Sequence, residues 1–264
     1  MANRPIISCK HLYNQMNPQQ TTQLPTVTHT TNRITAILIG INIAMFILAI
    51  IVDFRHTDFN PSPFQFLSPS MVSLYNLGAT GTIPLLEDQR WWTLIAAGFL
   101  HGGLLHLVFN MIAVHQLAPL VIVLFGVNRA IILYTLGSVG GYLLSCVGEI
   151  QYTIGASAAL CSLIGALLYY GKSRGDNLGR AIFNHIGGWV ISIAVVGFLI
   201  PGINNWGHGG GLLSGLLLGY IFGSNDSGRE TSGHRVGAAI CVIGSCLALL
   251  WSCFNGAVLL FVLK

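Results

Sequence analysis

Long apolar runs recur along this chain, and they constrain its fold more than any other feature. Runs of about 18 or more mostly apolar residues are long enough to cross the ~30 Å hydrocarbon core of a bilayer as helices. The chain has 264 residues, of which 53% are apolar and 8% are charged, whereas about 25% of the residues of a soluble domain are charged. The sequence therefore predicts an all-α, polytopic membrane helical bundle. It excludes a soluble enzyme, a nucleic-acid-binding protein and a disordered linker.

Seven membrane spans are predicted, and they divide the chain into three parts. A polar tail, residues 1–33, precedes six spans within residues 34–223, and residues 224–264 form a linker and one further span. A long connection, about residues 53–97, follows the first span and is rich in aromatic residues, which suits a membrane interface. The predicted spans are Ile34–Val52, Phe99–Pro119, Ala130–Val147, Thr153–Tyr170, Ala181–Ile200, Asn205–Phe222 and Val236–Leu263.

The sequence leaves the end of the second span and the geometry of the last span undetermined. The segment Leu120–Gly126 is also apolar, which leaves the end of the second span undefined. The last span has about 28 residues and would measure about 42 Å as a helix, more than the hydrocarbon core. We therefore expect it to tilt, to protrude or to bend near Asn255 and Gly256.

The distribution of charge predicts the orientation of the bundle. With the N-terminus in the cytoplasm, nine of the twelve Lys and Arg residues fall inside and only Arg55, Arg90 and Lys264 fall outside. Cytoplasmic loops carry an excess of basic residues, so the N-terminus is expected inside and the C-terminus and the long connection outside. The residues carry no recognisable organelle address, and we therefore expect a bacterial plasma (inner) membrane.

Strongly polar side chains stand in three of the predicted spans. Such side chains are costly in a bilayer and indicate function by default. The even-numbered spans run from outside to inside, so all three clusters lie in the outer part of the membrane, with Ser157 about 6 Å deep. A single site is the simplest explanation. Its candidate residues are His101, His106 and Asn110 in the second span, Gly155 and Ser157 in the fourth and His208 in the sixth.

Helical spacing separates the roles of the two histidines in the second span. His106 and Asn110 share a helix face because they are four residues apart, whereas His101 diverges from His106 by about 140°. We therefore expect His101 to face elsewhere, toward the loop above. Helical zinc ligands prefer a spacing of four residues and a third ligand nearby, so no metal site is predicted. The six cysteines show no zinc or disulfide spacing and are interpreted as mostly buried apolar side chains.

Small residues on two spans predict how the site is assembled. Glycines at every fourth position let two helix backbones approach closely in lipid. Packing of the sixth span against a small face of the fourth would bring Ser157 and His208, which both lie near the outer end, within reach of one another. The glycines are Gly207, Gly211, Gly215 and Gly219, and the small face of the fourth span is Ala158, Ser162 and Ala166.

The chemistry of these residue types is that of nucleophilic catalysis. A Ser hydroxyl is a weak nucleophile until a neighbouring base takes its proton, and a neutral His is the usual base near pH 7. The anion formed when Ser157 attacks an amide needs hydrogen-bond donors that already point at it. His106, the Asn110 amide and the Ser157 backbone N–H are the available donors.

These motifs resemble those of the rhomboid family of intramembrane serine proteases, over about residues 34–223, in a bacterial form with six spans plus one. The family pattern His-x4-His-x3-Asn is met at residues 101–110, Gly-x-Ser at residues 155–157, and His followed three residues later by Gly at residues 208–211. Trp91-Trp92 resembles the Trp-rich start of the family's second span. The resemblance implies a Ser157–His208 dyad without a carboxylate. It also implies an oxyanion hole from His106, Asn110 and the Ser157 N–H, and supporting positions for His101 and Gly155.

The same resemblance implies the substrate class and the cofactor requirement. It implies hydrolysis of a peptide bond in or near the transmembrane segment of another membrane protein, with no metal, nucleotide or organic cofactor and no nucleic-acid partner. Four positions depart from the family pattern. Ala158 stands for a usual Gly, Cys161 for a frequent Tyr, Thr93 for a usual Arg, and Ile122 lies nearest to an acidic residue that is missing.

Two other functions remain open from the sequence. A proteolytically silent rhomboid-like protein would bind transmembrane helices without cutting them, and the departures at Ala158 and Cys161 are compatible with it. A transporter or proton channel would use the histidines as a relay, but the inner halves of these spans are largely apolar. The sequence predicts neither the substrate nor the oligomeric state.

Overall fold

The computed structural model describes residues 28–62, 65–223 and 230–262. Within these residues the chain is almost entirely helical, with seven long helices and two isolated β-bridges. Five of the long helices are long and apolar enough to cross a membrane, which confirms a polytopic helical bundle. The long helices are α2 (His29–Val52), α5 (Leu104–Phe125), α6 (Val127–Val147), α7 (Ser157–Arg174), α8 (Asn177–Leu199), α9 (Asn205–Phe222) and α10 (Ser232–Val262).

The other two long helices, α7 and α9, correspond to the predicted fourth and sixth spans. Each has 18 residues, and neither is among the five helices apolar enough to cross a membrane by composition. In α7 serine, glycine, tyrosine and two basic residues dilute the apolar content, and in α9 glycine does so. Most side chains of α7 are buried inside the protein, so this helix does not need the apolar surface of a lipid-facing span.

The predicted boundaries of the first two spans need correction. The first helix begins at His29 rather than Ile34, because the side chain of Thr28 accepts a hydrogen bond from the Thr31 N–H and caps the helix. The end of the predicted polar tail is therefore helical, and residues 1–27 lie outside the described residues. The second long helix begins five residues after Phe99 and continues through Pro119 to Phe125, so the apolar segment 120–125 belongs to it.

The predicted fourth span also begins too early. Thr153 does not start a helix, because it exchanges two backbone hydrogen bonds with Thr80 (2.6 and 3.1 Å). Gly155 then adopts a positive φ of 116°, which an α-helix cannot contain. Ser157 is therefore the first residue of α7 instead of lying one turn inside it. α6, the predicted third span, starts three residues earlier than predicted, and α8, the predicted fifth span, starts four residues earlier. α9 has the bounds predicted for the sixth span.

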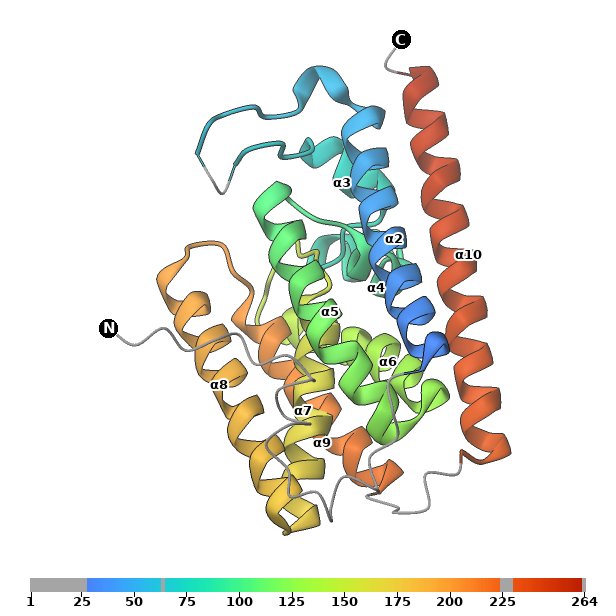
Figure 1. The fold of residues 1–264 in the computed structure, drawn as a ribbon. Helices are drawn as coiled ribbons and strands as arrows, with labels where there is room; N and C mark the ends of the chain where they lie inside the picture. The colour runs from blue at the N-terminus through green and yellow to red at the C-terminus, as the bar shows by residue number, and fades with distance from the viewer. Residues whose placement is uncertain (1–27, 63–64, 224–229, 263–264) are drawn as a thin grey trace.

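The last helix is continuous. α10 extends over 31 residues from Ser232 to Val262, about 46 Å at 1.5 Å per residue, and it remains helical through Asn255 and Gly256. Gly256 instead allows a close approach to α3 (Met71–Leu77), since a Cβ there would lie 2.9 Å from the Leu77 side chain. Figure 1 shows α10 beside α2 and extending below the lower end of α2.

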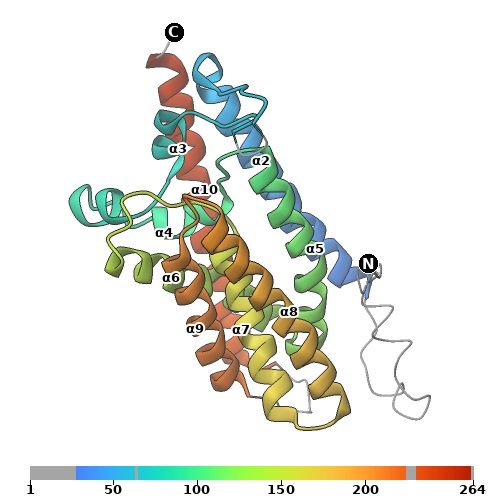
Figure 2. The same ribbon diagram turned by 90° about the vertical axis from the view of Figure 1, so that its left-hand side faces the viewer.

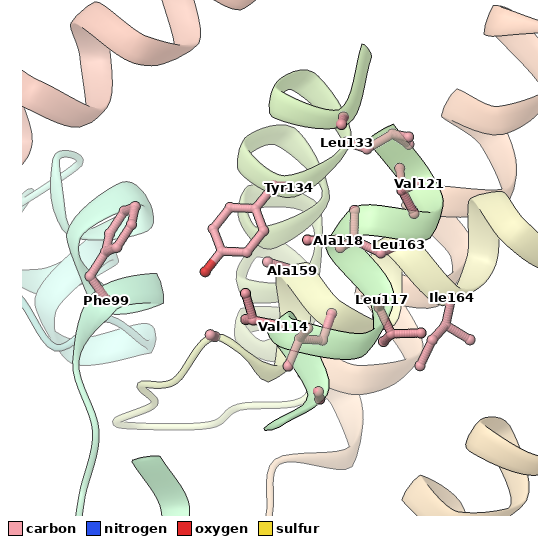
Figure 3. Close-up of a cluster of buried hydrophobic side chains, with 14 of the residues drawn as sticks. Phe99, Val114, Leu117, Ala118, Val121, Leu133, Tyr134, Ala159, Leu163 and Ile164 are labelled. Carbon is pink, nitrogen blue, oxygen red and sulfur yellow. The ribbon is translucent and has the colours of Figure 1, made fainter. Parts of the chain in front are cut away.

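α7 occupies the centre of the bundle. It packs against α5, α6, α8 and α9, and in Figure 2 α7, α8 and α9 lie together on the side opposite α2. Apolar side chains of α5, α6 and α7 form the main core (Figure 3), and they include Val114, Leu117, Ala118, Leu133, Ala159, Leu163 and Ile164. This core fixes the helix that begins with Ser157.

The long connection is folded against the bundle. It contains the short helices η2 (Phe54–His56), α3, η3 (Ile83–Glu87), α4 (Thr93–Ala96) and η4 (Ala97–Phe99). The Ser73 hydroxyl donates to the Ala49 carbonyl of α2, and the Ser252 hydroxyl of α10 donates to the Leu77 carbonyl at 2.7 Å. The connection is therefore held from both α2 and α10.

Candidate active site

Glycines of α9 lie directly on the backbone of α7, as the sequence predicts. A Cβ added to Gly211 or Gly215 would overlap the carbonyl oxygen of Ala158 or Ser162, respectively, and a Cβ on Gly219 would lie 3.0 Å from the Cα of Ala166. The paired residues advance together by four, so the two helices run parallel. Gly207, the first glycine of the series, instead faces α6 and its own helix cap.

The α7–α9 packing brings Ser157 and His208 to the same level. Cys161 lies one turn after Ser157 on α7, and Gly211 lies one turn after His208 on α9. A Cβ on Gly211 would be 3.1 Å from the Cβ of Cys161. One turn earlier, Ser157 and His208 occupy the neighbouring positions on these two faces, and both side chains are only partly buried.

The turn before Ser157 is held on both sides. The Gly155 N–H donates to the Ala97 carbonyl at 2.9 Å, and the Tyr142 hydroxyl donates to the Gly155 carbonyl at 2.7 Å. The positive φ of Gly155 favours glycine because it has no Cβ. This turn fixes the direction in which α7 and its first residue leave the loop.

His106 lies against this turn. A Cβ on Gly155 would be 2.7 Å from Nε2 and Cε1 of the imidazole, so the ring occupies the space that glycine leaves free. Nδ1 of His106 accepts from the Gly102 N–H at 3.4 Å, which assigns the proton of the neutral ring to Nε2.

The expectation that His101 faces away from His106 is wrong. His101 precedes α5 and lies in the loop, so helical spacing does not apply to the pair. Its fully buried ring contacts the His106 ring edge-on, with 5.0 Å between the centroids. His101 therefore packs behind His106.

Asn110 is buried one turn below His106 on α5. Its Nδ2 donates to the His106 carbonyl at 2.9 Å, and one of its two amide hydrogens remains for another acceptor. The Ser157 N–H is a further donor, because the first N–H groups of a helix have no partner within the helix and lie at its positive end.

The departures from the family pattern are accommodated in the structure. The Ala158 methyl is buried between α6 and α9, where a Cβ on Gly141 would come within 2.8 Å of it, so the methyl does not add bulk on the open side of Ser157. Cys161 fills the α7–α9 contact at Gly211. The Thr93 hydroxyl is buried, donates to the Arg90 carbonyl at 2.7 Å and lies 3.0 Å from Thr80 Oγ1.

A carboxylate does lie after the second long helix, but it comes from a distant part of the chain. Glu230, which precedes α10, accepts hydrogen bonds from the Asn128 N–H (2.6 Å), the Asn128 side chain (2.6 Å) and the Arg129 N–H (3.0 Å). It thereby caps the start of α6 next to Gly126. The sequence analysis did not find this residue, because about a hundred residues separate the partners.

Two further residues at the site were not predicted from the sequence. Tyr142 holds the Gly155 carbonyl, and Asn204 caps α9 one turn before His208. A tyrosine inside a span and an Asn immediately before a helical run are the signals that point to them. Among the described residues, no three His, Cys, Asp or Glu side chains come together as a metal site would require.

Ser157 at the start of a central helix and His208 on a parallel, glycine-packed neighbour thus lie at the same end of a polytopic membrane bundle. The rhomboid domain family matches residues 88–225, just over half of the chain. The chain belongs to the rhomboid family.

Relatives include plant and bacterial proteins. RHOMBOID-like protein 5 of Arabidopsis thaliana is 37% identical over 161 residues, 59% of this chain and 51% of the relative. RHOMBOID-like protein 6, mitochondrial, of the same plant is 34% identical over 165 residues, 59% of this chain and 52% of the relative. Rhomboid protease GluP of Bacillus subtilis (strain 168) is 30% identical over 167 residues, 63% of this chain and 32% of the relative. The chain thus spans about half, or about a third, of the length of these relatives.

Proposed function

We propose that this protein is an intramembrane serine endopeptidase that uses a Ser157–His208 dyad to cut membrane proteins in or near a transmembrane segment. The observation that carries the proposal is the parallel α7–α9 packing, which puts Cys161 against Gly211 one turn below the two residues. Family membership and the protease among the relatives support the same function.

We assign each step of the proposed reaction to a residue. His208 takes the proton of the Ser157 hydroxyl as the oxygen attacks the substrate carbonyl, and it later gives the proton to the leaving amine. The resulting oxyanion accepts hydrogen bonds from the Ser157 N–H, His106 Nε2–H and the free amide hydrogen of Asn110. Water then hydrolyses the acyl-enzyme, and His208 again acts as the base.

Lateral access for a substrate helix is supported by the packing of α8. This helix packs mainly on α7, and it is the least buried of the five helices that are apolar enough to cross a membrane. Phe198 and Leu199 at its end are 85% and 75% exposed. A weakly packed helix beside the one that carries Ser157 can move aside at low cost.

The proposed orientation follows the charge distribution. The N-terminus lies in the cytoplasm, and the C-terminus and the site lie toward the outer face of a bacterial plasma membrane. One relative is named as mitochondrial, so the alternative outcome is that this protein lies in a membrane other than a bacterial plasma membrane. Accessibility of single introduced cysteines in the long connection to an impermeant thiol reagent, in cells, distinguishes these orientations.

The proposal is tested by proteolysis in liposomes. The protein is reconstituted with single-span reporters that the B. subtilis rhomboid protease cleaves in parallel, together with Ser157→Ala and His208→Ala. We expect the parent to cleave at least one reporter in or near its transmembrane segment, and both variants to cleave none. A folded parent that binds these reporters intact, without any cleavage, would contradict the proposal and favour the silent helix-binding protein.

A further inference from the structure

Asn204 connects three elements of the site through one side chain. It is the N-cap of α9, and its Oδ1 accepts from the Gly207 N–H at 2.9 Å. Its Nδ2 donates to the Ser145 hydroxyl of α6 at 2.7 Å and to the Thr153 hydroxyl at 2.9 Å. Both amide hydrogens and the amide oxygen are therefore engaged.

The partners of Asn204 are themselves fixed. Ser145 is fully buried, and its hydroxyl donates to the Gly141 carbonyl at 2.9 Å. Thr153 is buried and pairs through its backbone with Thr80 of the long connection. Asn204 thus joins the start of α9 to Ser145 and Thr153, which are themselves held by hydrogen bonds to other parts of the bundle.

Along the chain, Asn204 precedes His208 by four residues, and its partner Thr153 precedes Ser157 by four residues. The Asn204 carbonyl accepts from the His208 N–H at 3.1 Å, so His208 follows the cap by one helical turn. Thr153 precedes Ser157 by four residues, in the turn that ends at Gly155. The Asn204–Thr153 hydrogen bond is therefore a direct link between the segment leading to Ser157 and the segment carrying His208.

The His208 side chain makes no hydrogen bond within the part of the chain that the structure describes. Its Nδ1 is buried and has no hydrogen-bond partner there, and the residue one turn after Ser157 is Cys161, which has no ring to support an imidazole. The direction in which the His208 side chain leaves α9 must then depend on where α9 starts and how that start is anchored.

We propose that Asn204 is a positioning residue of the reaction: it sets the separation of Ser157 and His208 by tying the α9 cap to Ser145 and Thr153. This inference rests on the proposed Ser157–His208 dyad. A misplacement of about 1 Å in such a pair costs on the order of 100-fold in rate, so loss of the ties should affect the chemical step more than folding.

Three substitutions at Asn204 separate positioning from simple capping. Asn204→Ala removes the cap and both ties. Asn204→Ser keeps a good N-cap but is too short to reach Ser145 and Thr153. Asn204→Asp keeps the cap but has no hydrogen to donate to the Ser145 hydroxyl, which already donates to the Gly141 carbonyl, so at most the tie to Thr153 remains. Asp176→Ala is the matched control, because Asp176 caps α8 by accepting from the Gly179 N–H at 2.7 Å, away from the proposed dyad.

The measurement is the saturation kinetics of a fluorophosphonate probe on the purified full-length protein, together with the thermal midpoint. We expect the maximal inactivation rate to fall about 10-fold or more in Asn204→Ala and Asn204→Ser, with the apparent affinity for the probe unchanged. Asn204→Ser should recover thermal stability but not rate, and Asn204→Asp, which loses the tie to Ser145, should recover only part of the rate. Asp176→Ala should lower stability without slowing the reaction.

The outcomes distinguish this inference from the proposed function. If the parent reacts and Asn204→Ser reacts as fast as the parent, Asn204 is only a helix cap and the inference is wrong. Equal slowing by Asp176→Ala would also overturn it, because the effect would then follow stability. If the folded parent does not react at all, the dyad itself fails. As an independent check, Thr153→Val should slow the reaction and should not add to the effect of Asn204→Ala.

Discussion

The contact between α7 and α9 offers the sharpest prediction, through the variant Gly215→Ala. A methyl group there would overlap the carbonyl oxygen of Ser162. Restoring an ordinary carbon–oxygen separation of about 3.3 Å requires the two helices to part by on the order of 1 Å. Overpacking of this kind costs about 1–3 kcal/mol, and the higher helix propensity of Ala offsets about 1 kcal/mol of it. The net loss of stability is therefore small.

The effect on the reaction should be much larger than the effect on stability. Because Ser157 and His208 lie on opposite sides of this contact, a separation of about 1 Å predicts a loss of rate on the order of 100-fold. The assay is the rate of fluorophosphonate labelling in detergent, beside the thermal midpoint. Gly209→Ala is the control on the same helix, since a Cβ there has nothing within 4 Å, and it should label at close to the parent rate. Equal labelling rates for Gly215→Ala and Gly209→Ala would refute the packing argument.

Three further variants test other parts of the structure. Gly155→Ala should lose about 1–2 kcal/mol from its positive φ and most of its labelling rate, whereas Gly102→Ala, whose Cβ meets only one side chain at 3.5 Å, should change neither. Glu230→Ala should lower the free energy of unfolding by about 1–2 kcal/mol, measured in a denaturant titration, and Glu230→Gln should retain part of it; no loss in either would contradict the capping of α6. Ser252→Ala should cost about 1 kcal/mol and raise hydrogen exchange where α10 meets α3, whereas Ser192→Ala, which loses only a bond within α8, should not.

Patterns within single segments predicted much of the fold. Apolar runs located the long helices because a membrane requires such runs wherever a helix crosses it. The glycines at every fourth position of α9 predicted a close helix contact, because small residues at this spacing let two backbones approach. Gly211 and Gly215 do lie on the α7 backbone. The shared direction of the fourth and sixth spans, together with these glycines, predicted that Ser157 and His208 lie at the same end of two neighbouring helices.

Features that depend on distant partners were not predictable from such patterns. The start of α7 at Ser157 depends on the pairing of Thr153 with Thr80, which lies in another loop. The contact of His101 with His106 arises because the chain is not helical between them. The carboxylate beside the start of α6 comes from Glu230, and no local spacing indicates that contact.

The reactivity of Ser157 tests the central claim most directly. The purified protein is treated with a fluorophosphonate probe and the adduct is mapped by peptide mass spectrometry, beside Ser157→Ala and His208→Ala variants of matched thermal stability. The account predicts one adduct, on Ser157, that both substitutions abolish. A folded parent without an adduct, an adduct on another serine, or full labelling of His208→Ala would contradict it.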